Sequence, residues 1–315
     1  MKVILANPRG FCAGVEMAIQ TVERALEIFG RPIYVFHEIV HNSHVVRSLE
    51  GQGTIFVDDV ESVPKGGTLI FSAHGVSPAV RQQAKARALR VIDATCPLVA
   101  KVHAEARNFA RDGYHIILIG HADHDEIVGT IGEAPESMSI VASVGEAQSI
   151  NVPTNLPLAY LTQTTLSVDD AQEIITLLQM RFPRLVGPAK DDICYATQNR
   201  QEAVSRLAAN ADIVLVVGSK NSSNSNRLRE VAEAHVAPAY LVDDETTMER
   251  SWFAGDEIVA VTAGASAPES AVKRVVKQLD EWFTLEVISE PPLLERTAFP
   301  LPEEIRELSQ VTALG

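Results

Sequence analysis

The sequence has no hydrophobic run long enough to cross a membrane. Its apolar stretches, such as residues 213–217, end far short of the roughly 20 residues that a membrane helix needs, and its first residues contain no apolar signal region. We therefore expect a cytoplasmic protein that has no membrane partner.

Basic residues are also scarce. The chain has 27 Lys and Arg residues against 41 Asp and Glu residues, a formal net charge of −14. A protein that binds nucleic acid needs a basic surface to displace counterions, and this sequence has neither a basic run nor an aromatic platform. We predict no nucleic-acid partner, although helix N-termini could still bind a small anion.

Nucleotide-binding motifs are missing as well. The sequence contains no P-loop and no GxGxxG pattern, so it does not indicate a bound nucleotide, flavin or nicotinamide. If the protein catalyses a reduction, its electrons must come from a separate carrier protein.

Cysteine is rare, and its placement is informative. The only three are Cys12, Cys96 and Cys194. An odd number of widely spaced cysteines argues against a disulfide framework and favours reduced thiols. Each stands in the predicted first turn of a helix, where the helix dipole favours the thiolate form.

The three cysteines open three copies of one layout. A polar residue follows each after 29 (41 − 12), 28 (124 − 96) or 28 (222 − 194) residues, and a second polar residue follows after 62 (74 − 12), 68 (164 − 96) or 72 (266 − 194) residues. These residues are, in order along the chain, His41, His74, His124, Thr164, Ser222 and Ser266. Three similar units predict three thiols around one axis.

Short apolar runs alternate with segments of helical period, which is typical of βαβ units with a parallel sheet. We predict an α/β fold of three pseudo-symmetric lobes with mostly parallel sheets, at residues 1–96, 97–193 and 194–284, followed by a tail at 285–315. The predicted strands are 33–36, 54–57, 68–72, 91–93, 115–119, 139–141, 158–161, 212–217, 239–242 and 257–261. The predicted helices are 13–29, 78–88, 98–111, 168–180, 199–209, 225–234 and 268–283.

Three thiolates without a fourth cysteine indicate a metal site that the protein does not close. A zinc ion held this way keeps one position open for water or substrate, and an iron–sulfur cluster keeps one iron without a protein ligand. A lone cysteine is more often a small buried hydrophobe, but the matched positions favour ligands here.

Polar loops follow the predicted strands at the ends where open α/β sheets bind ligands. They contain His41, His74 and His124 and the hydroxyl-rich and amide-rich segments 162–165, 218–226 and 262–268. Such donors at helix N-termini suit a phosphate or a diphosphate. Glu126, in the same predicted loop as His124, is a candidate proton donor or relay.

Six segments resemble the 4-hydroxy-3-methylbut-2-enyl diphosphate reductase family, whose members catalyse the last step of the non-mevalonate route of isoprene biosynthesis. They are 8–15 (PRGFCAGV), 72–76 (SAHGV), 93–97 (DATCP), 162–167 (TQTTLS), 192–197 (DICYAT) and 218–226 (GSKNSSNSN). The resemblance covers residues 1 to about 285.

The resemblance implies reductive dehydroxylation of the diphosphate substrate to isopentenyl and dimethylallyl diphosphates, with a ferredoxin or flavodoxin as electron donor. It implies a central [4Fe-4S] cluster on Cys12, Cys96 and Cys194, and catalytic roles for Glu126 and Thr165 beside the substrate hydroxyl. It also implies a diphosphate site, formed by His41, His74, His124, Ser222, Ser223, Asn224 and Ser266.

Two other readings of the three thiols remain open from the residues alone. One is a zinc-dependent phosphoester hydrolase, and the other is a cluster-binding redox sensor that catalyses nothing. The sequence leaves open the identity of the electron donor, the product ratio, the oligomeric state and the role of the tail.

Overall fold

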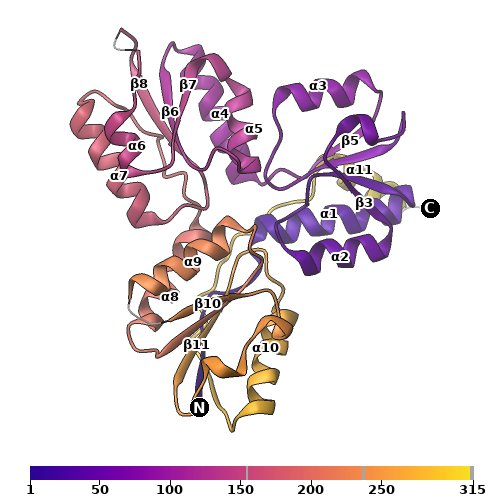
Figure 1. Cartoon of the computed structure of the whole chain (residues 1–315). Coiled ribbons are helices and arrows are strands. Elements are labelled where there is room, and N and C mark those ends of the chain that lie inside the picture. The colour runs from indigo at the N-terminus through magenta and orange to yellow at the C-terminus, as the bar shows by residue number, and fades with distance from the viewer. Residues whose placement is uncertain (154, 236–237, 313–315) are drawn as a thin grey trace. The chain divides into compact units, whose positions relative to one another are not determined.

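The computed structural model describes residues 1–153, 155–235 and 238–312. Strands and helices alternate along these residues (Figure 1), and every pairing between their named strands is parallel. The strands form three sheets, which confirms the predicted α/β class with three lobes. By contacts the chain divides into two compact units, which we call unit 1 (1–15, 41–47 and 195–297) and unit 2 (16–40, 48–194 and 298–315).

Unit 1 contains a five-stranded sheet of order β10-β9-β11-β1-β12. These strands are Ala239–Val242, Ile213–Val217, Ile258–Ala263, Lys2–Leu5 and Glu286–Ser289. Its helices are α8 (Tyr195–Ala208), α9 (Ser223–Ala234) and α10 (Glu269–Trp282), with short 3-10 turns η3 (Glu245–Thr247) and η4 (Arg250–Trp252). Aliphatic side chains of β9, β11 and α10 contribute to a buried core cluster on one face of the sheet.

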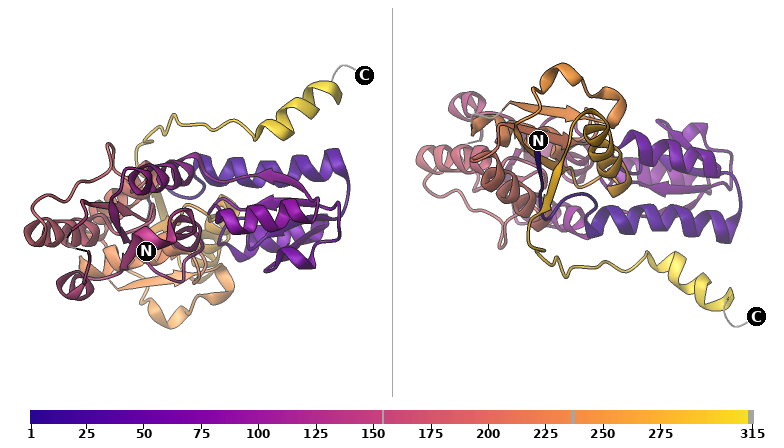
Figure 2. Two further views of the ribbon diagram at one scale, coloured as in Figure 1. Left: turned by 90° about the horizontal axis from the view of Figure 1, so that it is seen from above. Right: turned by 90° about the horizontal axis from the view of Figure 1, so that it is seen from below.

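Both ends of the chain differ from the sequence prediction. Residues 2–5 pair with 258–261 on one side and with 286–289 on the other, as the right-hand view of Figure 2 shows beside the N-terminus. The N-terminal strand thus joins the sheet of the third predicted lobe (194–284), and residues 286–289 form a strand within the predicted tail. Neither strand was predicted, because short apolar runs at chain ends show too few residues for a periodicity.

Unit 2 contains two sheets, of order β3-β2-β4-β5 and β7-β6-β8. The first consists of Thr54–Val57, Ile33–Phe36, Thr68–Phe71 and Arg90–Asp93, and the second of Met138–Val141, His115–Ile119 and Leu158–Thr162. All residues of β4 and β6 are buried, as expected for parallel strands covered on both faces.

Unit 2 also contains six complete helices and two 3-10 turns within its described residues. They are α3 (Pro78–Ala86), α4 (Pro97–Arg111), α5 (Asp125–Glu133), α6 (Val144–Ser149), α7 (Val168–Arg181) and α11 (Glu303–Thr312), with 3-10 turns η1 (Val60–Ser62) and η2 (Pro135–Ser137). Helices α1 (Ala13–Phe29) and α2 (Ser43–Gln52) begin in unit 1 and continue into unit 2.

Four helices, α2, α5, α6 and α11, were not predicted. Helix α5 matters most for the site because it contains Glu126. It was missed because its sequence contains two glycines, which lower helix propensity. Both are needed for close packing: a Cβ on Gly129 would lie 3.2 Å from the His103 ring, and a Cβ on Gly132 would lie 2.3 Å from the Ser77 Cβ. Glu126 therefore lies in the first turn of a helix rather than in a loop.

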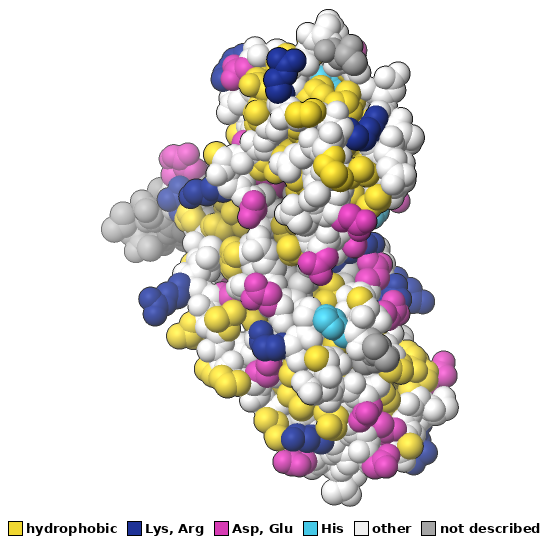
Figure 3. All heavy atoms as spheres, turned by 90° about the vertical axis from the view of Figure 1, so that its left-hand side faces the viewer, with side chains coloured by type: hydrophobic (Ala, Val, Ile, Leu, Met, Phe, Trp, Pro, Cys, Tyr) yellow, Lys and Arg dark blue, Asp and Glu magenta, His cyan; other side chains and the backbone are white. Residues whose placement is uncertain are grey.

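No helix within the described part of the chain is both long and apolar enough to cross a membrane. On the face drawn in Figure 3, single Lys and Arg side chains alternate with Asp, Glu and hydrophobic side chains, and basic charge does not gather into one patch.

Candidate active site

Each cysteine directly precedes a helix. Cys96 is the N-cap of α4, and Cys12 and Cys194 are followed at once by the first residues of α1 and α8. The sequence interpretation placed them in the first helical turn, and the structure places them one residue earlier. None of the three forms a disulfide, and each residue is partly exposed.

The backbone behind each cysteine is built in the same way. The cysteine N–H donates to a carbonyl oxygen that lies two residues past the end of a parallel strand, which is β11, β4 or β8. These bonds are Cys12 to Ala265 at 3.3 Å, Cys96 to Ala73 at 3.0 Å and Cys194 to Thr164 at 3.1 Å. The threefold repeat predicted from the spacing is thus present in the local structure of each cysteine.

Glu126 is a buried carboxylate held by one residue. Its side chain accepts two hydrogen bonds from Thr164, one from the backbone N–H to Oε1 at 2.7 Å and one from the hydroxyl to Oε2 at 2.8 Å. The residue is only 2% exposed. Thr164 therefore fixes the carboxyl plane in one orientation.

Burial raises the pKa of Glu126 to about 7, and the nearby charge of Asp192 acts in the same direction. The two hydrogen bonds from Thr164 lower the pKa and offset part of this effect. A carboxyl group with a pKa near neutrality can give up and regain a proton at physiological pH. This chemistry suits a proton donor.

His124 is the N-cap of α5, and its Nδ1 accepts the backbone N–H of Glu126 at 3.2 Å. Because Nδ1 is the acceptor, the neutral ring has its proton on Nε2. The ring of His74 lies edge-on to that of His124, with centroids 5.8 Å apart. Two imidazoles at the N-terminus of one helix form a local site for an anion.

Asp125 links His74 to His37, a histidine that is not among the predicted site residues. The Nδ1 of His37 lies 2.7 Å from Asp125 Oδ1, and the Nδ1 of His74 lies 3.9 Å from Oδ2. The hydrogen bond to Asp125 raises the pKa of His37. His37 has a φ of 56°, an uncommon conformation for a residue with a side chain. The backbone conformation of His37 and its contact with Asp125 appear only in the folded chain, so the sequence offers no reason to select this residue.

Thr165 lies next to Thr164 but has a different partner. Its hydroxyl accepts the Nε2 amide of Gln163 at 2.9 Å, and the Oε1 of Gln163 accepts the backbone N–H of His121 at 3.1 Å. The threonine that holds Glu126 is Thr164, which was counted in the repeat but was not selected as a site residue.

Unit 1 brings a second group of predicted residues together. Ser222 is the N-cap of α9, and its hydroxyl lies 3.5 Å from that of Ser266. The hydroxyl of Ser266 donates to the backbone carbonyl of His41 at 2.9 Å. Ser223 is the first residue of α9. Hydroxyls and backbone amides therefore gather at one helix N-terminus, as an anion site requires.

Asn224 provides a sharper indication of a ligand. Its Oδ1 accepts the backbone N–H of Ala265 at 2.8 Å, whereas its Nδ2 is buried and has no hydrogen-bond partner among the described residues. A buried donor without a partner is costly. An anionic ligand would satisfy it.

Asn224 and Glu126 occupy matching positions in the two units. Each lies two residues after a helix N-cap, Ser222 or His124. Each also accepts the backbone N–H of the residue whose carbonyl binds a cysteine N–H, which is Ala265 for Asn224 and Thr164 for Glu126. The repeat thus places an amide in one copy and a titratable carboxyl in the other.

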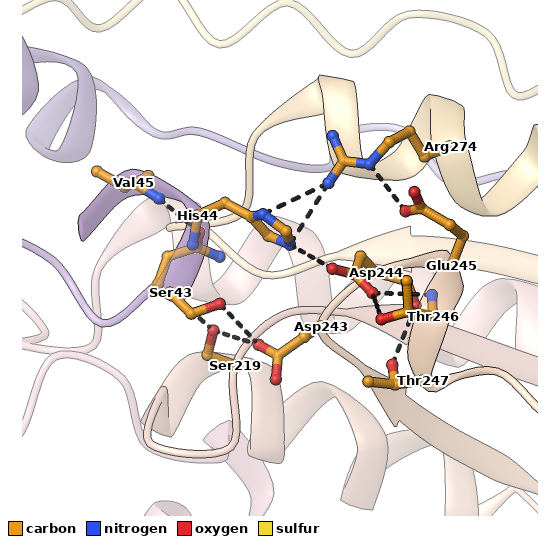
Figure 4. Close-up of polar contacts among 11 residues, drawn as sticks. Ser43, His44, Val45, Ser219, Asp243, Asp244, Glu245, Thr246, Thr247 and Arg274 are labelled. Atoms are coloured by element: carbon orange, nitrogen blue, oxygen red, sulfur yellow. Dashed lines mark hydrogen bonds and ion pairs between the residues drawn. The ribbon is translucent and has the colours of Figure 1, made fainter. Parts of the chain in front are cut away.

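A polar network fixes the segment that contains His41 (Figure 4). The hydroxyl of Ser219 donates to Asp243 at 2.5 Å and accepts the backbone N–H of Ser43 at 3.1 Å. Beside it, His44 Nε2 lies 3.0 Å from Asp244, and the guanidinium of Arg274 lies against the His44 ring. The network joins the residues after His41 to the loop that leads to Ser222.

The predicted site residues therefore form two groups, one in each unit, and hydrogen bonds or ring contacts connect the loops within each group. The first set is Cys12, His41, Ser222, Asn224 and Ser266. The second set is His74, His124, Glu126, Thr165 and Cys194.

The family model described as "LytB protein" matches residues 3–280 of the chain. Among curated proteins, the chain is 53% identical to a 4-hydroxy-3-methylbut-2-enyl diphosphate reductase from Azoarcus sp., over 97% of this chain and 98% of that protein. It is 54% identical to one from Aromatoleum aromaticum, again over 97% and 98%.

A solved structure gives the same result at lower identity. The E-1-hydroxy-2-methyl-but-2-enyl-4-diphosphate reductase from Plasmodium falciparum superposes with a TM-score of 0.94 at 39% identity and covers 99% of both chains. These matches confirm the resemblance predicted from the six motifs. The chain belongs to the LytB protein family.

Proposed function

We propose that this protein is an iron–sulfur oxidoreductase that converts (E)-4-hydroxy-3-methylbut-2-enyl diphosphate to isopentenyl and dimethylallyl diphosphates. The relatives that bear the name of this reductase match it over nearly its whole length. The structural observation that supports the proposal most directly is the backbone arrangement repeated behind Cys12, Cys96 and Cys194.

The three cysteines suit a [4Fe-4S] cluster with one iron left without a protein ligand. The three residues form no disulfide and are partly exposed, and each precedes a helix whose N-terminus favours negative charge. When bound, such a cluster supplies single electrons and an electron-accepting iron for the substrate oxygen. No amino-acid side chain in the site supplies electrons for this reduction.

The diphosphate is assigned to the hydroxyl, amide and imidazole donors. In unit 1 the donors are the unsatisfied Nδ2 of Asn224, the hydroxyls of Ser222 and Ser266 at the N-terminus of α9, Ser223, and His41. In unit 2 they are His74 and the Nε2–H of His124. Neutral donors and helix N-termini hold a diphosphate in spite of the acidic net charge.

Glu126 is assigned the proton transfer. Its carboxyl holds a proton near neutral pH because it is buried, and Thr164 keeps it in one orientation. We assign Thr165 to the substrate hydroxyl beside it. The substrate takes up two electrons and two protons, its C–O bond breaks, and the oxygen leaves as water while an allylic carbon gains hydrogen.

The chain has no nucleotide motif, so a ferredoxin or flavodoxin is proposed as the electron donor. We also propose that the protein acts in the cytoplasm and that its lobes follow the boundaries 1–96, 97–193 and 194–284. Strands β1 and β12, which by this division belong to the first lobe and to the tail, pair within the sheet of the third lobe.

Metal analysis of anaerobically purified protein tests the proposal. We expect iron and acid-labile sulfide in equal amounts, and we expect Cys12→Ser, Cys96→Ser and Cys194→Ser each to lose most of both. Zinc without sulfide would support the hydrolase instead. A cluster that gives no turnover of the diphosphate with reduced ferredoxin would support the sensor.

Aeration gives an independent check. An iron without a protein ligand is exposed to oxidants, so activity should disappear in air and return on anaerobic reconstitution with iron and sulfide. A zinc hydrolase would be insensitive to air.

A further inference from the structure

Residues 290–297, which we call the tail segment, follow strand β12 and bind both the loop before Cys12 and helix α8. The backbone N–H of Asn7 donates to Glu290 Oε2 at 3.0 Å, and Arg206 of α8 pairs with the same carboxylate at 3.2 Å. At the other end, Thr297 hydrogen-bonds the side chain of Tyr195. The tail segment is thus tied at both ends within unit 1.

Between these ends lies a buried arginine. Arg200 of α8 is completely buried, and its guanidinium donates to the carbonyl of Gly10 from Nε at 3.1 Å and from Nη2 at 2.7 Å. Nη2 also donates to the carbonyl of Phe11 at 3.2 Å. The guanidinium therefore holds the two peptide groups that directly precede Cys12.

Glu295 of the tail segment is the ion-pair partner of Arg200. Its Oε1 lies 3.1 Å from Nη1 of Arg200 and accepts the amide of Asn199 at 2.9 Å. A charged guanidinium loses its hydration when it is buried, and a buried charge without a partner is strongly destabilising. Arg200 can stay in place only while the carboxylate of Glu295 compensates its charge.

The opposite side of the same loop is held by strand β11. The N–H of Gly10 donates to the carbonyl of Ala263 at 3.1 Å, and that of Cys12 donates to Ala265 at 3.3 Å. Gly10 has a φ of 70°, and a Cβ there would lie 3.2 Å from the carbonyl oxygen of Ala267. Contacts on both sides therefore confine the loop to one conformation, and Arg200 supplies one of the two sides.

We propose that Arg200 and Glu295 are positioning residues for Cys12, and that the tail segment acts as a clamp that keeps this thiol in its ligand position. This rests on the proposed function only for the identity of the group that Cys12 binds. It assigns a role to a part of the tail, and it joins the loop before Cys12 to the helix that begins one residue after Cys194.

The test uses the full-length protein with Glu295→Gln and Glu295→Ala, and Glu286→Gln as a matched control on exposed strand β12. In iron-free protein, the rate at which iodoacetamide alkylates each cysteine is followed by peptide mass spectrometry. We expect Cys12 to react about tenfold faster in Glu295→Ala, less so in Glu295→Gln, because a hydrogen-bonded charge pair that held the loop is lost. Cys96 and Cys194 should keep their rates.

A second readout follows the reconstituted protein. Iron loss to a chelator should be faster in both Glu295 variants than in the control, and Arg200→Lys, which keeps the charge but loses the forked geometry, should be intermediate. Unchanged Cys12 alkylation in both Glu295 variants would overturn the proposal. Equal acceleration of all three cysteines would also overturn it, because it would indicate general loosening.

The two proposals fail in different ways. If the protein bound no cluster, the proposed function would be wrong, yet the alkylation rate of Cys12 in iron-free protein would still measure the clamp.

Discussion

Thr164 donates hydrogen bonds to both carboxylate oxygens of Glu126, at 2.7 Å from its backbone N–H and at 2.8 Å from its hydroxyl. One residue thus sets both the orientation and the proton affinity of the buried acid. Its carbonyl also accepts the N–H of Cys194, so the proposed proton donor and a proposed cluster ligand depend on the same residue.

Glu126→Gln tests the proton transfer. The amide keeps the shape of the side chain, and its oxygen can still accept the backbone N–H of Thr164, but it has no acidic proton to transfer, so kcat should fall by roughly 10²- to 10⁴-fold. Iron content and KM should change little. Steady-state kinetics measure kcat and KM, and iron analysis measures the cluster content. Glu173→Gln, on the exposed face of α7, is the control. Turnover at the wild-type rate would remove Glu126 from the mechanism.

The pH dependence of the reaction should follow the pKa of Glu126. Only the protonated carboxyl can donate, so kcat/KM should fall as the pH rises through about 7. The hydroxyl of Thr164 lowers this pKa, and its removal in Thr164→Val should raise the pKa and move the fall in kcat/KM to higher pH.

The matched control for this pH profile is Thr176→Val, at an exposed position on α7. Its profile should coincide with that of the wild type. A shift of the Thr164→Val profile to lower pH would contradict the expected direction, because losing the hydroxyl's hydrogen bond can only disfavour the charged carboxylate.

Asn224→Asp tests the diphosphate site. Aspartate can still accept the N–H of Ala265, but it replaces the unsatisfied Nδ2 donor by a negative oxygen that repels the diphosphate. We expect KM to rise roughly 10- to 100-fold while kcat at saturation changes less. Asn210→Asp, an exposed position beyond α8, adds the same charge and should leave KM unchanged. Equal KM values in the two variants would exclude Asn224 from the anion site.

Asp243→Ala tests the network in Figure 4. The carboxylate binds the hydroxyl of Ser219 at 2.5 Å, and Ser219 is 4% exposed, so its hydroxyl loses a charged partner at a cost of about 1.5–3 kcal/mol. The unfolding temperature should drop by a few degrees and KM should rise, because the segment after His41 is less well held. Thermal scanning and kinetics on Asp280→Ala, an exposed site on α10, give the reference. If Asp243→Ala had the same KM as Asp280→Ala, the network would have no role in substrate binding.

Local patterns were sufficient for the fold class and the repeat. Continuous apolar runs such as 116–119 and 213–217 identify a covered parallel sheet, because only such a sheet buries every side chain. The nearly equal spacing of 28 or 29 residues from each cysteine to the first polar residue reflects a repeated strand and helix length. The matching hydrogen bonds of Cys12, Cys96 and Cys194 follow from that repetition.

Helix α5 shows where local patterns failed. Its glycines argue against a helix in isolation, and they are tolerated because α5 packs closely on His103 and Ser77. Contacts of this kind join residues that are distant in the sequence, and propensity contains no information about them. The placement of Glu126 in a helical turn therefore depended on tertiary packing.

The sequence by itself determined the residue types of the site, the α/β class and the family, because these depend on composition, periodicity and motifs along the chain. Only the tertiary structure decided which threonine holds Glu126, that His37 pairs with Asp125, and that Glu295 compensates Arg200 beside the Cys12 loop. The last contact joins residues 95 positions apart, and the pKa of Glu126 depends on its burial. Both are properties of the folded chain, since hydrogen-bond partners and desolvation are fixed only when distant segments pack together.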